Sequence, residues 1–410
     1  MTLETMNPNL QQELRRTSPD YVVFDPGTLD QSNSTTGNEH FLVEKLPNGD
    51  LFAVWTQSSL EGRPDQHVVF AKSLDGGQTW SPPRTIAGAD PSRDLGMASW
   101  GFPLVSRHGR IYVLFSRHMG VNDFGTHVSG RLAGIFTDDA GETWSEAEFL
   151  SVARSSWDNP DPAMPPNCIV WQSPKRLARG RHLVGQTRWV TPALRESTGL
   201  GSVSEFLRFE NVDDHPTPSG LIIEPLMQDH LALRAGRSLE EPSIVPLPDG
   251  RLFAVMRSCE GHPFYSVSED EGDSWSQPEP LRQRDGGPLL PHPHSPCPIY
   301  ALDAANFAFF YHNHDGQLPH QESPGSDKCR RPVCLARGEF RPGAQQPVWF
   351  SEPWYFMDSG GVPLLKTGLS LYSSTTPIPD GFILWYPDRK FFLLGRRITL
   401  SMVDNLMVRA

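Results

Sequence analysis

The stretch Ser73–Trp80 has the sequence SLDGGQTW, and its pattern returns as TDDAGETW at Thr137–Trp144 and SEDEGDSW at Ser268–Trp275. All three fit Ser/Thr-x-Asp-x-Gly-x-Thr/Ser-Trp. In such a motif the Asp and Ser/Thr side chains can hydrogen-bond the backbone of their own turn. Gly permits a positive φ, and Trp can pack between sheets. The motif therefore predicts a repeated structural turn rather than a set of groups that contact a substrate.

The three turns recur at a regular interval along the chain. Asp75 and Asp139 are 64 residues apart, and Asp270 lies a further 131 residues on, close to two such steps. The interval predicts one unit without the motif near residue 205 and a degraded copy near residues 335–340. A fixed period with self-similar units is typical of a repeat architecture.

A second phrase accompanies the turns and supplies the strands. LPNGDLFAVWTQS at Leu46–Ser58 is nearly repeated by LPDGRLFAVMRSC at Leu247–Cys259. Each phrase indicates a tight turn followed by an apolar strand. Four short strands in each unit are typical of a propeller blade. We therefore predict an all-β domain over residues 21–410, preceded by a tail or short helix over residues 1–20.

Composition excludes several classes of protein. The formal net charge of −12 argues against a protein that binds nucleic acid through its phosphates. The 5 cysteines show no disulfide framework and no zinc pattern. The start lacks the apolar core of a signal peptide, and no apolar run approaches membrane-spanning length. We expect a cytoplasmic protein with no metal, cofactor, membrane or nucleic-acid partner, and its oligomeric state is left open.

The turns, their period and the accompanying strands resemble the sialidase (neuraminidase) superfamily, in its divergent branch of BNR-repeat proteins. Members of that superfamily are six-bladed β-propellers with four-stranded antiparallel blades. The resemblance implies an exo-acting retaining glycoside hydrolase that releases a terminal acidic sugar, either sialic acid or a related keto-deoxy sugar acid, from a glycan. In that superfamily a Tyr is the nucleophile, a Glu takes its proton, an Asp is the acid/base and three arginines hold the substrate carboxylate.

Three positions match this catalytic pattern closely. The segment EEPSIVPLPDGRLFAVMR places Glu241 before a turn and a strand that ends at Arg257. The resemblance implies that Glu241 is the base and that Arg257 binds the carboxylate, although a surface ion pair is the plain alternative. Tyr372, in GLSLYSSTTPIPDG, occupies the place of the nucleophile. A phenol needs a base and nearby positive charge to attack at neutral pH.

Two further roles have rival candidates. In CRRPVCLA the second gripping arginine is assigned to Arg331, with Arg330 as its rival. Arg suits this role because its planar fork meets a carboxylate with two parallel bonds. In LEGRPDQHVVF the acid/base is assigned to Asp65, with Glu61 as the weaker candidate. A solvated basic turn and an exposed loop carboxylate are the corresponding structural interpretations.

The pattern fails at the first gripping arginine. Its place is taken by Glu39, with His40 beside it. An acid there would repel a substrate carboxylate unless His40, an arginine from a neighbouring blade or another group intervenes. The candidate arginines are Arg107, Arg117 and Arg131.

A different substrate is the other way to account for Glu39. We therefore keep two other hypotheses: a non-catalytic glycan-binding propeller, and a glycosidase or lyase acting on another acidic polysaccharide. The alternating pairs His292/His294 and His312/His314 are interpreted as residues of the pocket rim rather than as metal ligands.

Overall fold

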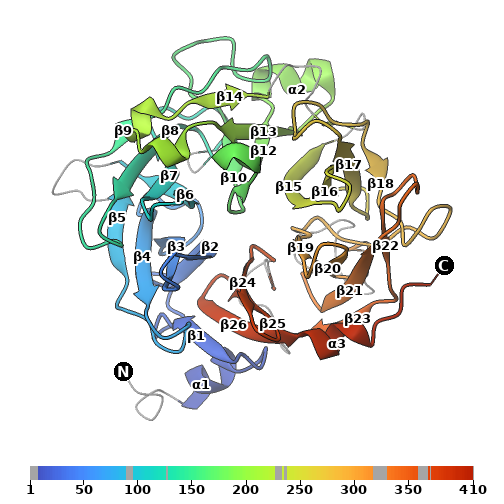
Figure 1. The fold of residues 1–410 in the computed structure, drawn as a ribbon. Coiled ribbons are helices and arrows are strands. Elements are labelled where there is room, and N and C mark those ends of the chain that lie inside the picture. Colours follow the sequence, from blue (N-terminus) through green and yellow to red (C-terminus); the bar gives the residue numbers. More distant parts are fainter. Residues whose placement is uncertain are drawn as a thin grey trace.

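Six antiparallel sheets surround a central axis in the computed structural model (Figure 1). The structure describes residues 8–88, 96–125, 128–226, 233–234, 238–316, 330–358, 368–369 and 371–409. Each sheet is one blade with at least four strands, and blades 3 and 5 carry one additional paired strand each. The predicted six-bladed β-propeller is confirmed.

The strands follow the chain from blade to blade, and the innermost strand of each blade is named first. Blade 1 comprises β2 (Gly37–Lys45), β3 (Leu51–Ser58), β4 (His67–Ser73) and β5 (Arg84–Gly88). Blade 2 comprises β6 (Ala98–Val105), β7 (Ile111–His118), β8 (Gly130–Thr137) and β9 (Glu148–Phe149). Blade 3 comprises β10 (Cys168–Val170), β12 (His182–Trp189), β13 (Ser202–Phe209) and β14 (Ile223–Pro225), with β11 (Lys175–Arg176) pairing β12.

The second half of the ring has the same order. Blade 4 comprises β15 (Leu239–Pro246), β16 (Leu252–Ser258), β17 (Phe264–Ser268) and β18 (Glu279–Pro280). Blade 5 comprises β19 (Ile299–Ala301), β20 (Asn306–Tyr311), β21 (Val333–Phe340) and β22 (Val348–Phe350), with β23 (Trp354–Met357) pairing β21. Blade 6 comprises β24 (Ser374–Ile378), β25 (Gly381–Asp388), β26 (Phe392–Thr399) and β1 (Tyr21–Phe24).

Blade 6 closes the ring with strands from both halves of the chain. Its outer strand β1 pairs β26, with Tyr21 opposite Gly395. Helix α1 (Pro8–Leu14) precedes β1, and Leu14 is buried in the core between blades 5 and 6. Residues 1–7 of the predicted tail lie outside the described residues. The ring is thus closed by the pairing of the N-terminal strand β1 with the C-terminal strand β26.

The core consists of apolar layers between neighbouring blades. One layer joins Phe52 and Phe70 of blade 1 to Val113 and Ile135 of blade 2, and the other five interfaces have equivalent clusters. Burial of this apolar surface is the main favourable term that holds the blades together. Because the layers lie between blades, the inner strand ends remain available for polar side chains.

The three Asp motifs lie in blades 1, 2 and 4, between the third and fourth strands. In the first, Asp75 accepts hydrogen bonds from the Thr79 backbone N–H at 2.9 Å and from its hydroxyl at 2.6 Å. Ser73 Oγ accepts from the Gly77 N–H at 2.8 Å, and Gly77 has φ 93°. The other two motifs repeat these bonds. The predicted turn chemistry is therefore confirmed.

The tryptophan that ends each motif connects its blade to the preceding one. Each of these rings lies against an aromatic ring of the previous blade, with centroids 5.7, 5.2 and 4.2 Å apart for the pairs Trp80–Trp385, Trp144–Phe70 and Trp275–Phe206. Aromatic pairs at such distances add to the apolar burial. The motif therefore specifies both a turn and an inter-blade contact.

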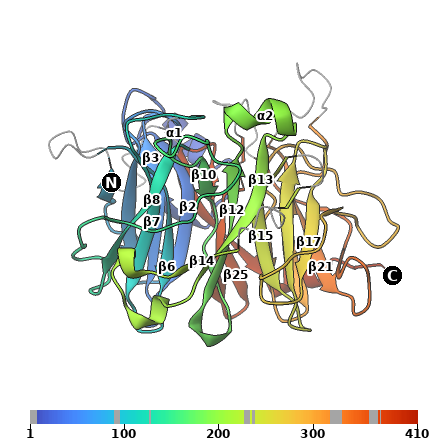
Figure 2. The same cartoon turned by 90° about the horizontal axis from the view of Figure 1, so that it is seen from above.

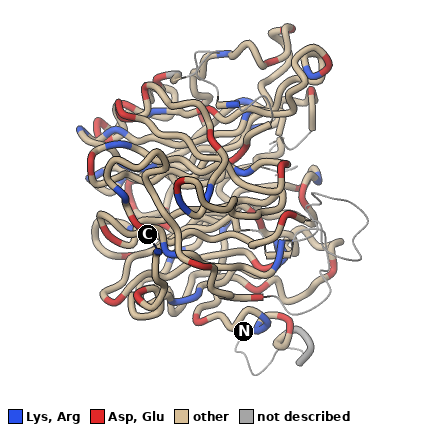
Figure 3. The backbone as a smooth tube through the Cα atoms, turned by 90° about the vertical axis from the view of Figure 1, so that its right-hand side faces the viewer, with Lys and Arg blue, Asp and Glu red and all other residues tan. Residues whose placement is uncertain are grey.

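Helices are few and lie outside the blades. Helix α2 (Pro192–Thr198) follows β12 and lies at one end of the propeller (Figure 2). Helix α3 (Leu400–Asp404) follows β26 (Figure 1). Acidic and basic residues are interspersed along the chain (Figure 3). No helix among the described residues is long and apolar enough to cross a membrane.

Candidate active site

Three inner strands carry the same backbone irregularity near their first residues. His40 on β2, Trp100 on β6 and Glu241 on β15 have φ of 51°, 55° and 54°, and the strand register shifts at each of them. Such values are uncommon for residues other than Gly and accompany β-bulges that redirect side chains. The backbone N–H groups of Trp100 and Glu241 each donate to a threonine hydroxyl of the preceding blade at 2.7 Å, namely Thr56 and Thr187.

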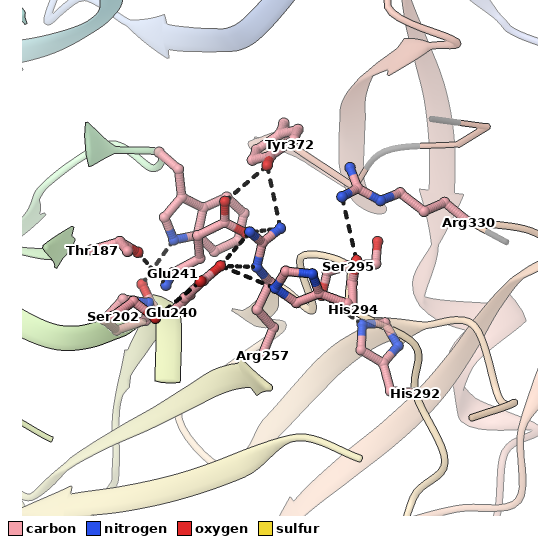
Figure 4. Close-up of polar contacts among 12 residues, drawn as sticks. Thr187, Ser202, Glu240, Glu241, Arg257, His292, His294, Ser295, Arg330 and Tyr372 are labelled. Carbon is pink, nitrogen blue, oxygen red and sulfur yellow. Dashed lines mark hydrogen bonds and ion pairs between the residues drawn. The ribbon is translucent and has the colours of Figure 1, made fainter. Parts of the chain in front are cut away.

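Tyr372, Glu241 and Arg257 meet at the end of the axis where the inner strands begin (Figure 4). Tyr372 Oη donates to Glu241 Oε1 at 2.8 Å, and Arg257 Nη1 lies 3.5 Å from the same phenolic oxygen. Arg257 Nη1 also pairs with Glu241 Oε2 at 3.1 Å. All three side chains are buried. The structure therefore brings together three residues that lie far apart in the sequence.

Burial has the largest effect on the pKa values of Tyr372 and Glu241. Burial and then the charge of Glu241 raise the pKa of Tyr372, although Arg257, Arg330 and Lys390 act in the opposite direction. Burial also raises the pKa of Glu241, against the lowering effect of Arg257. The phenol is thus protonated in the resting site, and Glu241 Oε1 is positioned to receive its proton.

Glu240 also points into the site, as its contacts with Arg257 and His294 show. Strand alternation would direct Glu240 and Glu241 to opposite faces. The bulge at Glu241 breaks this alternation, so Glu240 pairs with Arg257 through Nη2 and through Nε at 2.8 Å. Ser202 Oγ donates to Glu240 at 2.9 Å, and His294 Nε2 lies 3.1 Å from its Oε2. Glu240 therefore holds the Arg257 guanidinium in position through its Nε and Nη2 atoms.

A lysine from the β25–β26 turn accompanies Glu39. Lys390 Nζ lies 2.9 Å from Glu39 Oε2 and 2.5 Å from Glu61 Oε2, and 5.5 Å from the centroid of the Tyr372 ring. Gln66 Nε2 donates to Glu39 Oε1 at 2.7 Å. Burial and the charge of Glu61 raise the pKa of Glu39 to about 8. Lys390 is therefore shared by the two carboxylates of Glu39 and Glu61.

Asp65 accepts hydrogen bonds within its own loop, and its role as acid/base stays a prediction. Its Oδ2 accepts from the Ser59 backbone N–H at 2.8 Å, and its Oδ1 accepts from the Ser59 hydroxyl at 3.2 Å. These bonds close the loop between β3 and β4. Glu61, in the same loop, is the carboxylate that contacts Lys390 beside the phenol. The described contacts therefore connect Glu61, and not Asp65, to Tyr372.

The role predicted for Arg331 stays a prediction, and the structure shows how this arginine and Arg330 differ. Arg331 Nε pairs with Asp358 Oδ1 at 2.8 Å, on the side of β23. Arg330 is buried, lies near Glu241 and Tyr372, and its Nη2 donates to the His294 carbonyl at 3.3 Å (Figure 4). Order along the chain cannot show which of two adjacent arginines faces the site, because strand geometry decides the direction of each side chain. Of the two, Arg330 is the arginine whose charge acts on both Glu241 and Tyr372.

His40 lies against the nucleophile candidate. Its ring centroid is 4.8 Å from that of Tyr372 and 5.1 Å from that of Trp100. The arginines considered as substitutes for the missing one lie elsewhere. Arg117 and Arg131 stack on Phe149 of blade 2. Arg107 pairs with Asp213.

The histidine pairs are divided between the site and the core. His294 reaches Glu240, whereas His292 and His312 stack on each other in the interior with centroids 5.3 Å apart. Within the described ranges no group of three or more His, Cys, Asp or Glu side chains is arranged to hold a metal ion. Sequence reasoning missed Lys390 because nothing in the turn PDRKFF distinguishes it from a surface lysine.

Comparisons with known proteins agree with this architecture. A family described as a BNR repeat-like domain matches residues 49–383. The Hadza microbial sialidase Hz136 superposes with a TM-score of 0.64 at 14% identity, over 91% of this chain and 67% of that one. The intramolecular trans-sialidase from Ruminococcus gnavus gives 0.61 at 15% identity, over 95% and 98%. A protein of unknown function from Dyadobacter fermentans gives 0.57 at 14% identity, over 93% and 97%. No curated protein matches the sequence.

Proposed function

The chain belongs to the family of proteins with a BNR repeat-like domain, and from its site we propose that it is a retaining glycoside hydrolase that releases a terminal acidic sugar. Tyr372 is the nucleophile and Glu241 is its base. The observation that carries the proposal is the 2.8 Å hydrogen bond between them in a buried pocket, with Arg257 beside the phenol. A nucleophile and a base within such reach are the signature of an activated nucleophile.

The reaction proceeds in two displacements. Tyr372 Oη bonds to the anomeric carbon while its proton passes to Glu241, and the leaving oxygen departs with its bonding electrons and a proton from the acid/base. Water then attacks the same carbon and gives a proton to the acid/base, and Tyr372 leaves and recovers its proton from Glu241. Two inversions retain the anomeric configuration.

A phenol suits a sugar whose anomeric carbon carries a carboxylate. A carboxylate nucleophile would approach this carbon with like charge, whereas Tyr372 approaches as a neutral group. Arg257 and Arg330 hold the sugar carboxylate through charge-assisted hydrogen bonds. Lys390 supplies a positive charge between Glu39 and Glu61, and burial raises the pKa of Glu39, so the position of the missing arginine repels the substrate less than a free carboxylate would. Sialic acid and related keto-deoxy sugar acids have this chemistry.

Glu61 is the proposed acid/base. It lies in the loop that enters β4, is exposed, and contacts Lys390 near the phenol. Asp65 is the second candidate, but both of its carboxylate oxygens bind Ser59. A general acid must reach the leaving oxygen directly or through one water. Glu61 is preferred because its contact with Lys390 places it beside the phenol.

The nucleophile is tested with aryl glycosides of acidic sugars. Tyr372→Phe removes the attacking oxygen and keeps the ring, so we expect kcat/KM to fall by at least about 1,000-fold. The control is Tyr355→Phe, because Tyr355 is exposed on β23. Full activity of the Tyr372 variant would reject the proposal. Sugar binding by the wild type without turnover would instead indicate a glycan-binding propeller.

The acid/base is tested with glycosides that have good and poor leaving groups. A poor leaving group needs protonation, so we expect Glu61→Gln to slow its release by about 100-fold while affecting the good leaving group much less. Asp65→Asn is the matched control and should affect both substrates equally. The reverse pattern would assign the acid/base role to Asp65.

The pH dependence of turnover tests the base. Glu241 must be ionised to accept the proton, and burial raises its pKa above the ordinary 4.5. We therefore expect kcat/KM to fall as the pH falls, with the acidic limb above pH 4.5. A rate that stays level down to pH 4 would contradict this role for Glu241.

A further inference from the structure

A turn with a strained backbone carries Lys390 into the site. It connects β25 to β26, and the Phe391 N–H donates to the Asp388 carbonyl at 3.0 Å across it. Its two middle residues, Arg389 and Lys390, have φ of 54° and 59°. The left-handed region is unfavourable for residues with a Cβ, and such conformations persist only where surrounding contacts enforce them. Specific contacts must therefore hold this turn.

Helix α1, at the outside of the ring (Figure 1), supplies contacts to Arg389. Arg389 Nη1 pairs with Glu13 Oε2 at 2.5 Å, and Arg389 Nη2 donates to the Glu13 backbone carbonyl at 2.9 Å. Within the turn, Arg389 Nη2 also pairs with Asp388 Oδ2 at 2.8 Å. Arg389 is buried, and a buried charge requires such partners. The arginine is thus fixed between α1 and its own turn.

Blade 1 holds the other side of the same turn. The Asn38 N–H donates to the Lys390 carbonyl at 2.7 Å, and Asn38 Nδ2 donates to the Phe391 carbonyl at 2.8 Å. Asn38 is buried on β2, directly before Glu39. The Lys390 side chain extends from the turn to Glu39 Oε2 at 2.9 Å and to Glu61 Oε2 at 2.5 Å. The turn therefore connects α1 to two acidic side chains of blade 1.

We propose that Glu13 is a positioning residue of the candidate active site and acts through Arg389 on Lys390. Among the described residues, Arg389 has two carboxylate partners, and Glu13→Gln removes one of them. With this ion pair lost, the strained turn relaxes. The Lys390 ammonium then leaves its position between Glu39 and Glu61.

The titration of Glu39 reports where the Lys390 ammonium lies. Burial and the charge of Glu61 raise the pKa of Glu39, whereas the charge of Lys390 lowers it. The Gln66 amide also donates to this carboxyl. A cation that moves away from a carboxyl raises its pKa, because the ionised form loses stabilisation. This measurement requires neither a substrate nor turnover.

Carbon-13 NMR of the full chain, labelled at its Glu side-chain carboxyls, measures the titration, and Glu39→Gln identifies the signal by its loss. Lys390→Met should raise the midpoint of Glu39 by about one pH unit or more, as expected for loss of a neighbouring opposite charge. Glu13→Gln should raise the midpoint in the same direction. Asp380→Asn is the matched control, because it removes an equal charge from an exposed pair with Arg397 on blade 6 and should leave the midpoint unchanged. A midpoint that does not move in Glu13→Gln would overturn the proposal.

A double-mutant cycle shows whether Glu13 acts through Lys390. In the Lys390→Met background, Glu13→Gln should have no further effect on the Glu39 midpoint, because the cation that it positions is already absent. An equal shift in both backgrounds would show that α1 affects Glu39 by another route, and the proposal would be wrong.

Binding of sialic acid extends the test and rests on the proposed function. With Lys390 displaced, Glu39 and Glu61 face the sugar carboxylate without their cation. Glu13→Gln should therefore weaken binding of sialic acid several-fold and leave binding of its methyl ester unchanged. Equal weakening for both ligands would contradict an effect of the Lys390 charge. If the wild type does not bind sialic acid, the proposed function fails, whereas the Glu39 titration still decides whether Glu13 positions Lys390.

Discussion

Replacement of Glu39 by Gln should remove a pH dependence of the unfolding free energy that this buried carboxyl causes at the candidate site. Glu39 is buried, and burial with the charge of Glu61 raises its pKa from 4.5 to about 8. Between these two pH values the folded chain holds a proton that the unfolded chain has released. The stability that this proton contributes is complete below pH 4.5 and is lost once the pH has passed about 8.

The magnitude follows from the size of the pKa shift. One pH unit of differential protonation corresponds to roughly 1.4 kcal/mol. From pH 5 to pH 7 the wild type should therefore lose on the order of 2–3 kcal/mol relative to the Glu39→Gln variant, which cannot titrate there. Above pH 8 the difference between the two proteins should stay constant.

Urea unfolding at pH 5, 6, 7 and 8 measures this difference, because groups that titrate in both proteins cancel. Gln66→Met is the control: it removes the amide that donates to Glu39 Oε1 but leaves the carboxyl in place, so the pH dependence should persist. Stability curves for wild type and Glu39→Gln that remain parallel from pH 5 to 8 would refute the reasoning. The position of the missing arginine would then carry a negative charge at pH 7.

Two further substitutions test the fold by unfolding free energies. Gly141→Ala should destabilise by about 2–4 kcal/mol, because a Cβ at φ 88° is strained and would lie 2.4 Å from the Phe70 ring. Gly109→Ala, with φ 93° and no atom near the new Cβ, should cost only about 1–2 kcal/mol, and equal losses would contradict the inter-blade contact. Arg188→Met should cost about 3–5 kcal/mol because it leaves two buried carboxylates without their cation. Arg176→Met, which breaks a half-exposed pair, should cost about 1 kcal/mol or less, and a similar cost for both would show that burial does not matter.

The closeness of Tyr372, Glu241 and Arg257 was predictable because the resemblance assigns each to a blade position. In a closed propeller, equivalent positions on the inner strands meet at the axis whatever their separation along the chain. Glu241 and Tyr372 are 131 residues apart and yet share a hydrogen bond. For these residues, the position within each repeat was sufficient to predict that they lie close together.

The sequence could not rank neighbouring candidates where backbone detail decides the direction of a side chain. Glu240 and Glu241 share a site because of a bulge, and no pattern of residue types signals that bulge. Whether Arg330 or Arg331 lies near Tyr372 depends on how the chain enters β21. Asp65 satisfies its own loop, a local bond that leaves no distinct trace in the sequence.

By itself the sequence determined the propeller, because each Asp motif completes its hydrogen bonds within eight residues and so acts without the rest of the chain. Together with the family resemblance, it also placed Glu241 and Tyr372 on blades whose inner ends meet. Only the tertiary structure decided what balances Glu39, since Lys390 arrives from a turn 351 residues away when blade 6 closes against blade 1. A charge that is paired across the closure of a ring depends on geometry that no local motif contains.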